Sequence, residues 1–443
     1  MKITLVGGGS YAWTPRLVTN FLLNEDLQPL DIELCLYDVV QEHLDEVFEL
    51  CNLYKKVIPQ SRMIFSKTMD FKTALEGAAY VIVAISHGGL EPELEDHRIA
   101  RKYGFYNLKG SEVGIAGCSR TLRHAPELLR IARGMEQYCP NALLLNVTNP
   151  LTALTRVVNK YTSIKAYGFC HGIINHLHVL FPLFGAENWK DIDFTVAGVD
   201  HCSWLLDVKF KGQDALEIIK KGGYVEKAKR GEKVAIFDDE FAGEESERLR
   251  FLIWDVIGYL PGLSDEHCVE FFGQLMKTPE SRKYYDITYD RITARTASVE
   301  GAKKDVRDCV AKLKAGEIVK LERCGEIIDR FIAAQLGFGA YTDVMNTPNV
   351  GQIPDLPMGT VVETKCLIDA CGVHPICAGE LPPIINSIVR PIAIREELYM
   401  EAAVEDNIEK LKAALSTDPL VNDFVKIDEL CEELMTYNRQ FWN

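Results

Sequence analysis

The first 170 residues alternate short apolar runs with stretches of helical periodicity. Two of the clearest helical stretches cover residues 40–54 and 122–138. The apolar runs between such stretches have the length of buried strands, and they occupy residues 3–6, 32–37, 62–65, 80–85, 142–146 and 165–169. Strands that alternate with helices predict a parallel sheet covered by helices on both faces.

The pattern changes near residue 190. Residues 194–199 and 204–210 read as strands of an antiparallel sheet, and helical periodicity dominates residues 303–338 and 395–437. We therefore predict an α/β fold: a Rossmann-like doubly wound parallel sheet over residues 1–190, followed by a mixed α+β domain over residues 191–443. This is the architecture of malate dehydrogenase, with the second domain supplying substrate, metal and oligomer contacts.

Charge and cysteine content narrow the class of protein. The chain has 443 residues with 49 Lys+Arg against 64 Asp+Glu, a net charge of −15, which argues against nucleic acid and anionic membranes as partners. The chain opens directly on an apolar strand, unlike a signal peptide, and lacks an apolar run long enough to span a membrane. Thirteen scattered cysteines without zinc-finger spacing favour a reducing compartment, so we expect a cytoplasmic protein.

A glycine-rich turn follows the first strand and precedes a helix. It fits the G-x-G-x-x-A dinucleotide fingerprint, and an acidic residue ends the second strand, where it can accept bonds from the adenosine ribose. An acidic group there favours NAD over NADP. An ordinary turn with an unrelated aspartate is the alternative. The predicted cofactor-binding residues here are Gly7, Gly8, Gly9, Ser10, Tyr11 and Asp38.

The segment N-V-T-N-P, residues 146–150, ends a predicted strand at the edge where doubly wound sheets bind ligands. Asn146 is predicted to contact the nicotinamide side of the cofactor, and Asn149 is placed to contact substrate. The Asn149–Pro150 bond is a candidate for a cis peptide. The alternative is that the segment is only favourable turn chemistry.

Cys170 and His201 are candidate metal ligands. Cys170 follows the last strand of the parallel half, and His201 follows a strand about thirty positions later. Thiolate and imidazole suit a borderline transition metal, and a catalytic site leaves positions open for substrate oxygens. Taken singly, a buried apolar cysteine and a core histidine are the more common fates of these residue types.

Titratable and aromatic residues gather in the segment 258–272. Tyr259, Asp265 and His267 are of the residue types that abstract a proton from a substrate. The alternative is a polar loop that leads into a helix capped by Ser264, although the third residue after Ser264 is His267 and completes no capping box.

Taken together, these motifs resemble family 4 of the glycoside hydrolases, which depend on NAD and manganese. The resemblance extends over nearly the whole chain, through G-G-G-S, N-V-T-N-P, G-F-C-H-G, V-D-H, S-D-E-H and the run 346–357 (N-T-P-N-V-G-Q-I-P-D-L-P). It implies that Cys170 and His201 hold Mn²⁺, that Asn149 contacts the sugar, and that the enzyme is a homodimer or homotetramer.

Three departures from the family pattern refine this expectation. Asp200 stands where the family usually has Asn before the metal histidine. Residues 108–113 read L-K-G-S-E-V where many members carry G-Q-E-T; Glu112 is matched to the glutamate of that motif and is a predicted substrate contact. The run C-H-G-I after Cys170 resembles the branch that acts on unphosphorylated α-galacturonides or α-glucuronides, and there Asp265 or His267 replaces a tyrosine as the base.

The mechanism that the resemblance implies is redox-assisted elimination, outside the two-carboxylate scheme of most glycosidases. NAD takes hydride from C3 of the sugar, a base removes the C2 proton, the C1–O bond breaks, water adds, and the ketone is reduced again. His171 is placed to protonate the leaving oxygen. A uronate carboxylate needs a basic partner, for which the candidates are Lys109, Arg120 and Arg123.

Three alternatives remain at this point. The first is the same mechanism on another unphosphorylated α-glycoside, such as an α-glucoside or α-galactoside. The second is a malate-type 2-hydroxy-acid dehydrogenase, which would accumulate NADH and need no metal. The third is a non-catalytic NAD-binding sensor, in which Cys170 and His201 would have no joint role.

Overall fold

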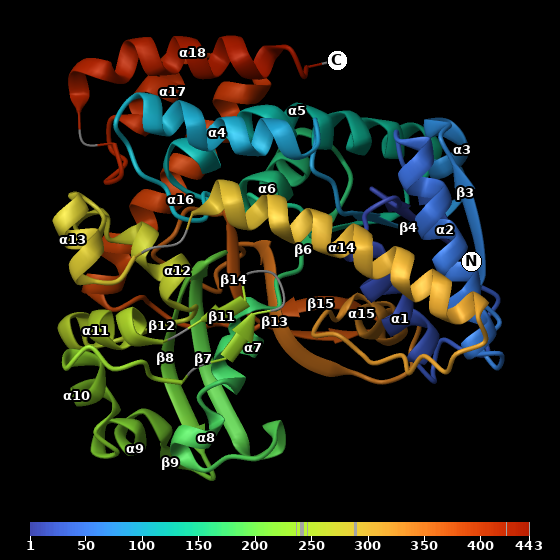
Figure 1. Cartoon of the computed structure of the whole chain (residues 1–443), viewed down its shortest axis with the longest axis horizontal. Helices are drawn as coiled ribbons and strands as arrows, with labels where there is room; N and C mark the ends of the chain where they lie inside the picture. The colour runs from blue at the N-terminus through green and yellow to red at the C-terminus, as the bar shows by residue number, and fades with distance from the viewer. Residues whose placement is uncertain (236, 240–242, 246, 288–289, 422, 443) are drawn as a thin grey trace.

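The parallel half of the molecule is built as its periodicity predicts. The computed structural model describes residues 1–235, 237–239, 243–245, 247–287, 290–421 and 423–442, with no side-chain description for 236–246 (Figure 1). Its parallel strands are β1 (Lys2–Val6), β2 (Glu33–Tyr37), β3 (Ile64–Thr68), β4 (Ala78–Val83), β5 (Leu143–Asn146) and β6 (Ala166–Gly168). They lie in the order β3-β2-β1-β4-β5-β6, which is the doubly wound order. All six predicted strands therefore form at or beside their predicted positions.

Helices cover both faces of this parallel sheet, as expected for crossover connections. They are α1 (Trp13–Leu23), α2 (Gln41–Val57), α3 (Phe71–Leu75), α4 (Leu90–Lys102), α5 (Gly114–Tyr138) and α6 (Leu151–Tyr161). The next two helices, α7 (Gly172–His178) and α8 (Phe181–Phe184), pack instead in the apolar cluster that contains Val196 and Leu205. Apart from the edge strand β3, which has no fully buried residue, the parallel strands are almost wholly buried, which explains why they read as continuous apolar runs.

The second half of the chain continues the same sheet with antiparallel strands. These are β7 (Ile192–Val199), β8 (Cys202–Phe210), β9 (Gln213–Asp214), β12 (Leu260–Pro261), β13 (Tyr341–Pro348), β14 (Val361–Asp369) and β15 (Gly372–Pro375). From β6 the order runs β13-β14-β7-β8-β12, and the predicted β7–β8 pair is antiparallel. The short pair β10 (Phe237–Asp239) and β11 (Gly243–Glu245) lies apart. Within the described residues the two predicted domains thus share one sheet of thirteen strands.

The helical pattern of residues 303–338 and 395–437 is interrupted more often than predicted. The helices of this half are α9 (Ala215–Lys221), α10 (Tyr224–Lys229), α11 (Arg248–Ile257), α12 (Asp265–Cys268), α13 (Pro279–Tyr284), α14 (Arg291–Lys314), α15 (Ile328–Gln335), α16 (Pro383–Val404), α17 (Ile408–Leu415) and α18 (Ile427–Arg439). Gly316, at φ +80°, follows the end of α14. Asn407 caps α17 by accepting bonds from the N–H groups of Glu409 and Lys410, which separates α17 from α16.

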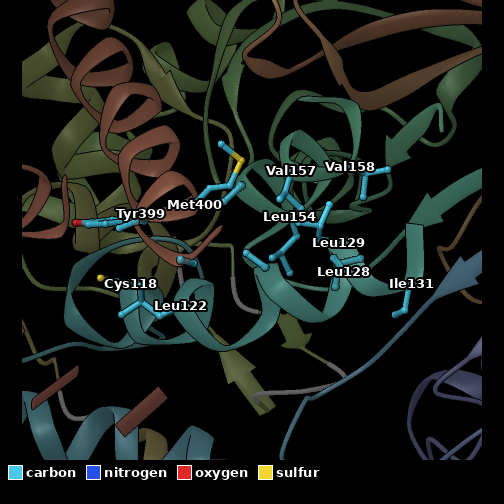
Figure 2. Close-up of a cluster of buried hydrophobic side chains, with 14 of the residues drawn as sticks. Cys118, Leu122, Leu128, Leu129, Ile131, Leu154, Val157, Val158, Tyr399 and Met400 are labelled. Carbon is cyan, nitrogen blue, oxygen red and sulfur yellow. The ribbon is translucent and has the colours of Figure 1, made fainter. Parts of the chain in front are cut away.

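The C-terminal helices return to the N-terminal half and complete its core. Figure 2 shows Tyr399 and Met400 of α16 beside apolar side chains of α5 and α6, among them Leu122 and Leu154. In Figure 1, α17 and α18 lie next to α4 and α5, while α14 runs across the front of the molecule. The change near residue 190 is therefore a change from parallel to antiparallel strands. It is not a boundary between separate apolar cores, because residues from both halves share one core. Among the described residues, no helix combines the length and apolar character needed to cross a membrane.

The turn between β1 and α1 depends on Gly7. Its φ of +90° lies in the left-handed region, and a Cβ placed there would lie 2.1 Å from the carbonyl oxygen of Ala84 at the end of β4. The N–H groups of Gly7 and Gly8 both bond the carbonyl of Tyr37 at the end of β2, at 3.0 and 2.8 Å. The turn is therefore held against two neighbouring strands and leaves no room for a side chain.

We expect Gly7→Ala to destabilise the protein by about 2 kcal/mol more than Gly185→Ala. Both positions have positive φ, but a Cβ at Gly185 would meet no atom within 4 Å, so this variant reports the backbone cost alone. The additional loss comes from the contact with Ala84, which forces backbone to move. Urea unfolding of both variants measures the difference, and equal losses would contradict the crowding.

Candidate active site

The glycine-rich turn predicted to bind the nucleotide and Asp38 meet at the carboxyl edge of the parallel sheet. Asp38 Oδ2 accepts a bond from the Gly9 N–H at 2.8 Å, and its Oδ1 accepts one from Val40 at 3.0 Å. Each oxygen keeps lone-pair capacity for a ribose hydroxyl. No described hydrogen bond uses the N–H groups of Tyr11 and Ala12, which precede α1 and can face a pyrophosphate. The Tyr11 hydroxyl instead bonds Glu46 at 3.0 Å.

The two asparagines of the turn after β5, Asn146 and Asn149, have different surroundings. Asn146 is fully buried; its amide donates to the carbonyl of Thr148 and the hydroxyl of Thr155, and its oxygen accepts from the Thr148 N–H. Its side chain shapes the turn and is closed to a cofactor, so the prediction that Asn146 binds NAD is wrong. Asn149 is half-buried, with no side-chain hydrogen bond to the described residues, and its bond to Pro150 is cis as anticipated.

Two turns bring Cys170, Asp200 and His201 together. Cys170 lies between β6 and α7, at the same sheet edge as the nucleotide turn, while the other two form the tight turn from β7 to β8. His201 has φ +61°, an uncommon conformation for a residue with a side chain. One potential ligand atom from each of the three residues lies within 4.8 Å of the others. The structure thus unites the two predicted ligands and adds a carboxylate.

The donor set of this cluster fits a divalent metal ion. His201 Nε2 lies 3.3 Å from Asp200 Oδ2, yet His201 Nδ1 and Asp200 Oδ2 are buried atoms without a hydrogen-bond partner among the described residues. Glu112 also lies close to this cluster. Its Oε1 is 3.7 Å from His201 Nδ1, and its Oε2 is buried without a hydrogen-bond partner among the described residues. Burial raises the pKa of Asp200. A cation would relieve both the orphaned atoms and the unfavourable burial of charge.

Asn346 and Glu363 support the cluster from the antiparallel strands. The Asn346 amide donates to Asp200 Oδ1 at 3.1 Å and to Glu363 Oε1 at 3.3 Å, and Ser203 donates to the other Glu363 oxygen. All are buried, and burial followed by the charge of Asp200 raises the pKa of Glu363 well above its ordinary range. Asn346, Glu363 and Ser203 were assigned no role from the sequence. The one local feature that could have drawn attention to Asn346 is its place at the start of the N-T-P-N run.

The four candidate proton-transfer residues differ in how close they lie to the cluster. The His267 ring lies 4.5 Å from the His201 ring, centroid to centroid. Burial, followed by the charges of His201 and Lys109, holds the pKa of His267 well below its usual range, so it is neutral at neutral pH. His171 directly follows Cys170, and its Nδ1 contacts the carboxylate of Glu326.

The other two candidates have structural contacts of their own. Asp265 Oδ1 accepts a bond from the backbone N–H of Arg250, which ties α12 to α11. Tyr259 packs against the apolar cluster that contains Trp204. Among the described residues, no hydrogen bond or ring contact joins Tyr259 to Cys170, Asp200 or His201.

The predicted basic partners of a substrate carboxylate have carboxylates of their own. The Arg123 guanidinium forms two hydrogen bonds with Asp96, at 2.9 and 2.6 Å, and others with Asn438 and the carbonyl of His87. Its side chain is 1% exposed, so Arg123 is a buried structural ion pair and the substrate role predicted for it is wrong. Lys109 pairs with Glu266 at 2.6 Å, and Arg120 lies 3.4 Å from Glu93.

Glu270 holds the loop that carries Lys109 and Glu112. Its carboxylate accepts bonds from three consecutive backbone N–H groups, those of residues 108–110, at 2.8–3.1 Å. Burial raises the pKa of Glu270 to about 7, although these N–H donors act in the opposite direction. Glu270 lies in the segment 258–272 but was assigned no role there, since a carboxylate that accepts from a distant backbone leaves no local pattern in the sequence.

Glu270→Gln should change how stability depends on pH. Because the pKa of Glu270 is raised in the folded state, folding favours the protonated carboxyl, and stability is lost as pH rises from about 4.5 to about 7. We expect the wild type to lose about 3 kcal/mol across this window relative to Glu270→Gln. Urea unfolding at several pH values measures this, with the exposed Glu187→Gln as control. Parallel curves for wild type and Glu270→Gln would contradict the raised pKa.

Comparison with known proteins relates the whole chain to one family. The model of the family 4 glycosyl hydrolases matches residues 2–183, and that of the family 4 glycosyl hydrolase C-terminal domain matches residues 196–421. The chain is 32% identical to an alpha-galactosidase of Bacillus subtilis, over 98% of this chain and 97% of the relative. It is 27% identical to an alpha-galacturonidase of Thermoanaerobacterium saccharolyticum, over 100% and 96% of the two chains.

Solved structures agree with the fold. A 6-phospho-alpha-glucosidase from gut microorganisms, in complex with NAD and Mn²⁺, has a TM-score of 0.82 at 20% identity and covers 100% of this chain and 98% of its own. Malate dehydrogenase of Plasmodium falciparum has a TM-score of 0.52 at 13% identity and covers 91% of this chain and 99% of its own. Both identities are low enough that these likenesses concern the fold alone, and they confirm the predicted architecture.

Proposed function

Because the chain belongs to family 4 of the glycosyl hydrolases, we propose that it cleaves α-uronides by NAD-assisted oxidation and elimination. Hydrolysis of an α-glycosidic bond is the activity that the names of the two relatives described above share, since they are called alpha-galactosidase and alpha-galacturonidase. Membership of this family favours a glycosidase over the malate-type dehydrogenase and the non-catalytic sensor. What remains to be proposed is the substrate and the work of individual residues.

The observation that carries the proposal is the buried cluster of Cys170, Asp200 and His201 at the sheet edge that also holds the nucleotide turn. We assign this cluster to Mn²⁺ and the turn at Gly7–Tyr11, together with Asp38, to NAD. When bound, these groups supply hydride acceptance at C3 of the sugar and Lewis-acid stabilisation of the charge that develops at C2 and C3. Solved relatives of the same fold are in complex with NAD and Mn²⁺.

The chain's own residues position the sugar and move protons. Asn149, with its side chain available, is proposed to hold a sugar hydroxyl. His267 is neutral at neutral pH and lies against His201, so it is our first choice as the base for the C2 proton. Asp265 is the second choice, because one of its oxygens already bonds backbone. The packing of Tyr259 makes it the weakest choice.

His171 is proposed as the acid that protonates the leaving oxygen. Glu326 contacts its Nδ1 and so orients the ring next to Cys170. Glu112, whose Oε1 lies 3.7 Å from His201 Nδ1, is proposed to contact the sugar. Asp200 is proposed as a third metal ligand, so that a thiolate and a carboxylate together match the two charges of the ion.

A uronide is the proposed substrate for two reasons. The C-H-G-I run resembles the uronide branch of the family, and an alpha-galacturonidase is related to this chain over its full length. The competing substrate is an α-galactoside, because an alpha-galactosidase is also similar over nearly the whole chain. The two substrates differ only in the group at C6, so the discrimination depends on a cation near that position.

Removal of a ligand should weaken Mn²⁺ binding without loss of NAD binding. We expect Cys170→Ser to lower the affinity for Mn²⁺ by about 100-fold or more and Asp200→Asn by about 10-fold, since even outer-shell partners are worth 10–100-fold. Free Mn²⁺ measured by electron paramagnetic resonance gives the affinity, and calorimetry with NAD tests the nucleotide site. Cys371→Ser, at an exposed cysteine, is the control. Unchanged Mn²⁺ affinity in Cys170→Ser would overturn the assignment.

The substrate is tested with 4-nitrophenyl α-galacturonide, α-glucuronide, α-galactoside and α-glucoside, each with NAD, Mn²⁺ and a thiol. We expect kcat/KM for a uronide to exceed that for the matching neutral glycoside by at least ~10-fold, because one charge-assisted hydrogen bond is worth about 1.5–3 kcal/mol. Hydrolysis of neutral glycosides alone would replace the uronide proposal, and hydrolysis of none would overturn the function.

A further inference from the structure

Three arginines converge on a single buried glutamate beside the active site. Glu93 of α4 is 2% exposed. Its carboxylate lies 3.4 Å from the guanidinium of Arg120 on α5, and it accepts hydrogen bonds at 2.7 and 3.1 Å from Arg291 and Arg295 on α14. Burial alone would raise the pKa of Glu93, but the three arginines outweigh it and hold the pKa well below its usual range.

This cluster carries more positive than negative charge. Among the described ion pairs, three guanidinium groups face the one carboxylate of Glu93. Asp96 also acts on Arg120 through its charge, but its hydrogen bonds go to Arg123 and Ser119, and Asp290 pairs with Arg101. Arg120 is 11% exposed, and its Nε is buried without a hydrogen-bond partner among the described residues. Buried positive charge in excess is costly unless an anion compensates it. The cluster is therefore built to receive a further anionic group.

The arginine cluster adjoins the active-site loop. Burial raises the pKa of Glu112, whose Oε1 lies 3.7 Å from His201 Nδ1, well above its ordinary range, and the charge of Arg120 acts in the opposite direction. Burial holds the pKa of His267 well below its usual range, and the charge of Arg291 adds a smaller contribution in the same direction. A Cβ on Gly110 would lie 3.2 Å from the ring of His97, one helical turn after Glu93. The cluster thus lies within electrostatic reach of both sides of the candidate metal site.

Lys109 is the other cation of this region, and it is less suited to an incoming anion. Its ammonium group pairs with the Glu266 carboxylate at 2.6 Å and its side chain is 7% exposed, so one buried carboxylate already compensates its positive charge. Arg295 in contrast is 23% exposed, and only its Nε has a described bond. Guanidinium groups also bind a carboxylate in bidentate geometry, which an ammonium cannot do.

We propose that Arg120, Arg291 and Arg295 form the specificity site for the anionic C6 carboxylate of the sugar. The inference rests on the proposed glycosidase function and names the residues that select a uronide over a neutral sugar. Glu93 acts as a positioning residue, because it gathers arginines from two elements, α5 and α14, that are far apart in the sequence.

The test compares kcat/KM for 4-nitrophenyl α-galacturonide, α-galactoside and α-galactoside 6-phosphate in the holoenzyme with NAD and Mn²⁺. Arg295→Gln should lower the ratio of uronide to galactoside by about 30-fold, the effect of losing one charge-assisted bond. Arg295→Lys should lower it less, and Arg120→Gln should lower it at least as much as Arg295→Gln. Arg130→Gln, which removes a surface partner of Glu127 on the same helix as Arg120, should keep the wild-type ratio.

Binding of free sugars supplies a readout that does not depend on turnover. Galacturonate should inhibit the wild type more strongly than galactose, and Arg295→Gln should abolish that difference. Equal losses on uronide and galactoside in both arginine variants would overturn the inference and leave the glycosidase function intact. A wild-type preference for the 6-phosphate would overturn the carboxylate assignment, whereas no cleavage of any α-glycoside would mean that the proposed function itself fails.

Discussion

The contact between Asn346 and its neighbours joins the two halves of this protein. Asn346 pairs with Gly168 at the single point where the antiparallel strands meet the parallel sheet, and a Cβ on Gly168 would lie 2.9 Å from it. Its amide then bonds Asp200, from the β7–β8 turn, and Glu363 of β14. Because Cys170 follows Gly168 by two residues, this contact sets the distance between the thiol and the other candidate ligands. A metal site made from both halves is possible only where the sheet is continuous.

The second constraint is charge. An acidic protein with net charge −15 buries Asp200 close to Glu112, Glu363 and Glu396. After burial itself, the charge of Asp200 is what raises the pKa of each of these three glutamates. Such a group of carboxyls is unfavourable without a cation. Beside it the arginine cluster at Glu93 has the opposite imbalance. The site thus has one face that favours a metal ion and another that favours an anion, which suits a sugar bound through its hydroxyls and a carboxylate.

Local patterns predicted the fold and the nucleotide turn well. Strand and helix periodicity depends on which faces are buried, and the glycine turn depends on backbone conformation, so both leave a short-range signal. The errors concern side chains whose roles depend on distant partners. Asn146 carries the expected residue type at the expected edge, yet its amide is consumed by Thr148 and Thr155. Arg123 meets Asp96 and Asn438, the latter 315 positions away, so no local pattern distinguished it from a substrate ligand.

Local sequence patterns were enough to predict the doubly wound half, the glycine turn assigned to NAD and the antiparallel pair after residue 190. They also carried the family resemblance. Each of these features depends on residues within one contiguous segment. Tertiary structure alone decided that Asp200 joins Cys170 and His201, that Glu270 holds the 108–110 loop, and that Arg291 and Arg295 reach Glu93 across about 200 positions. These features arise from strand order and helix packing, which bring together residues whose spacing along the chain carries no information about their distance in space.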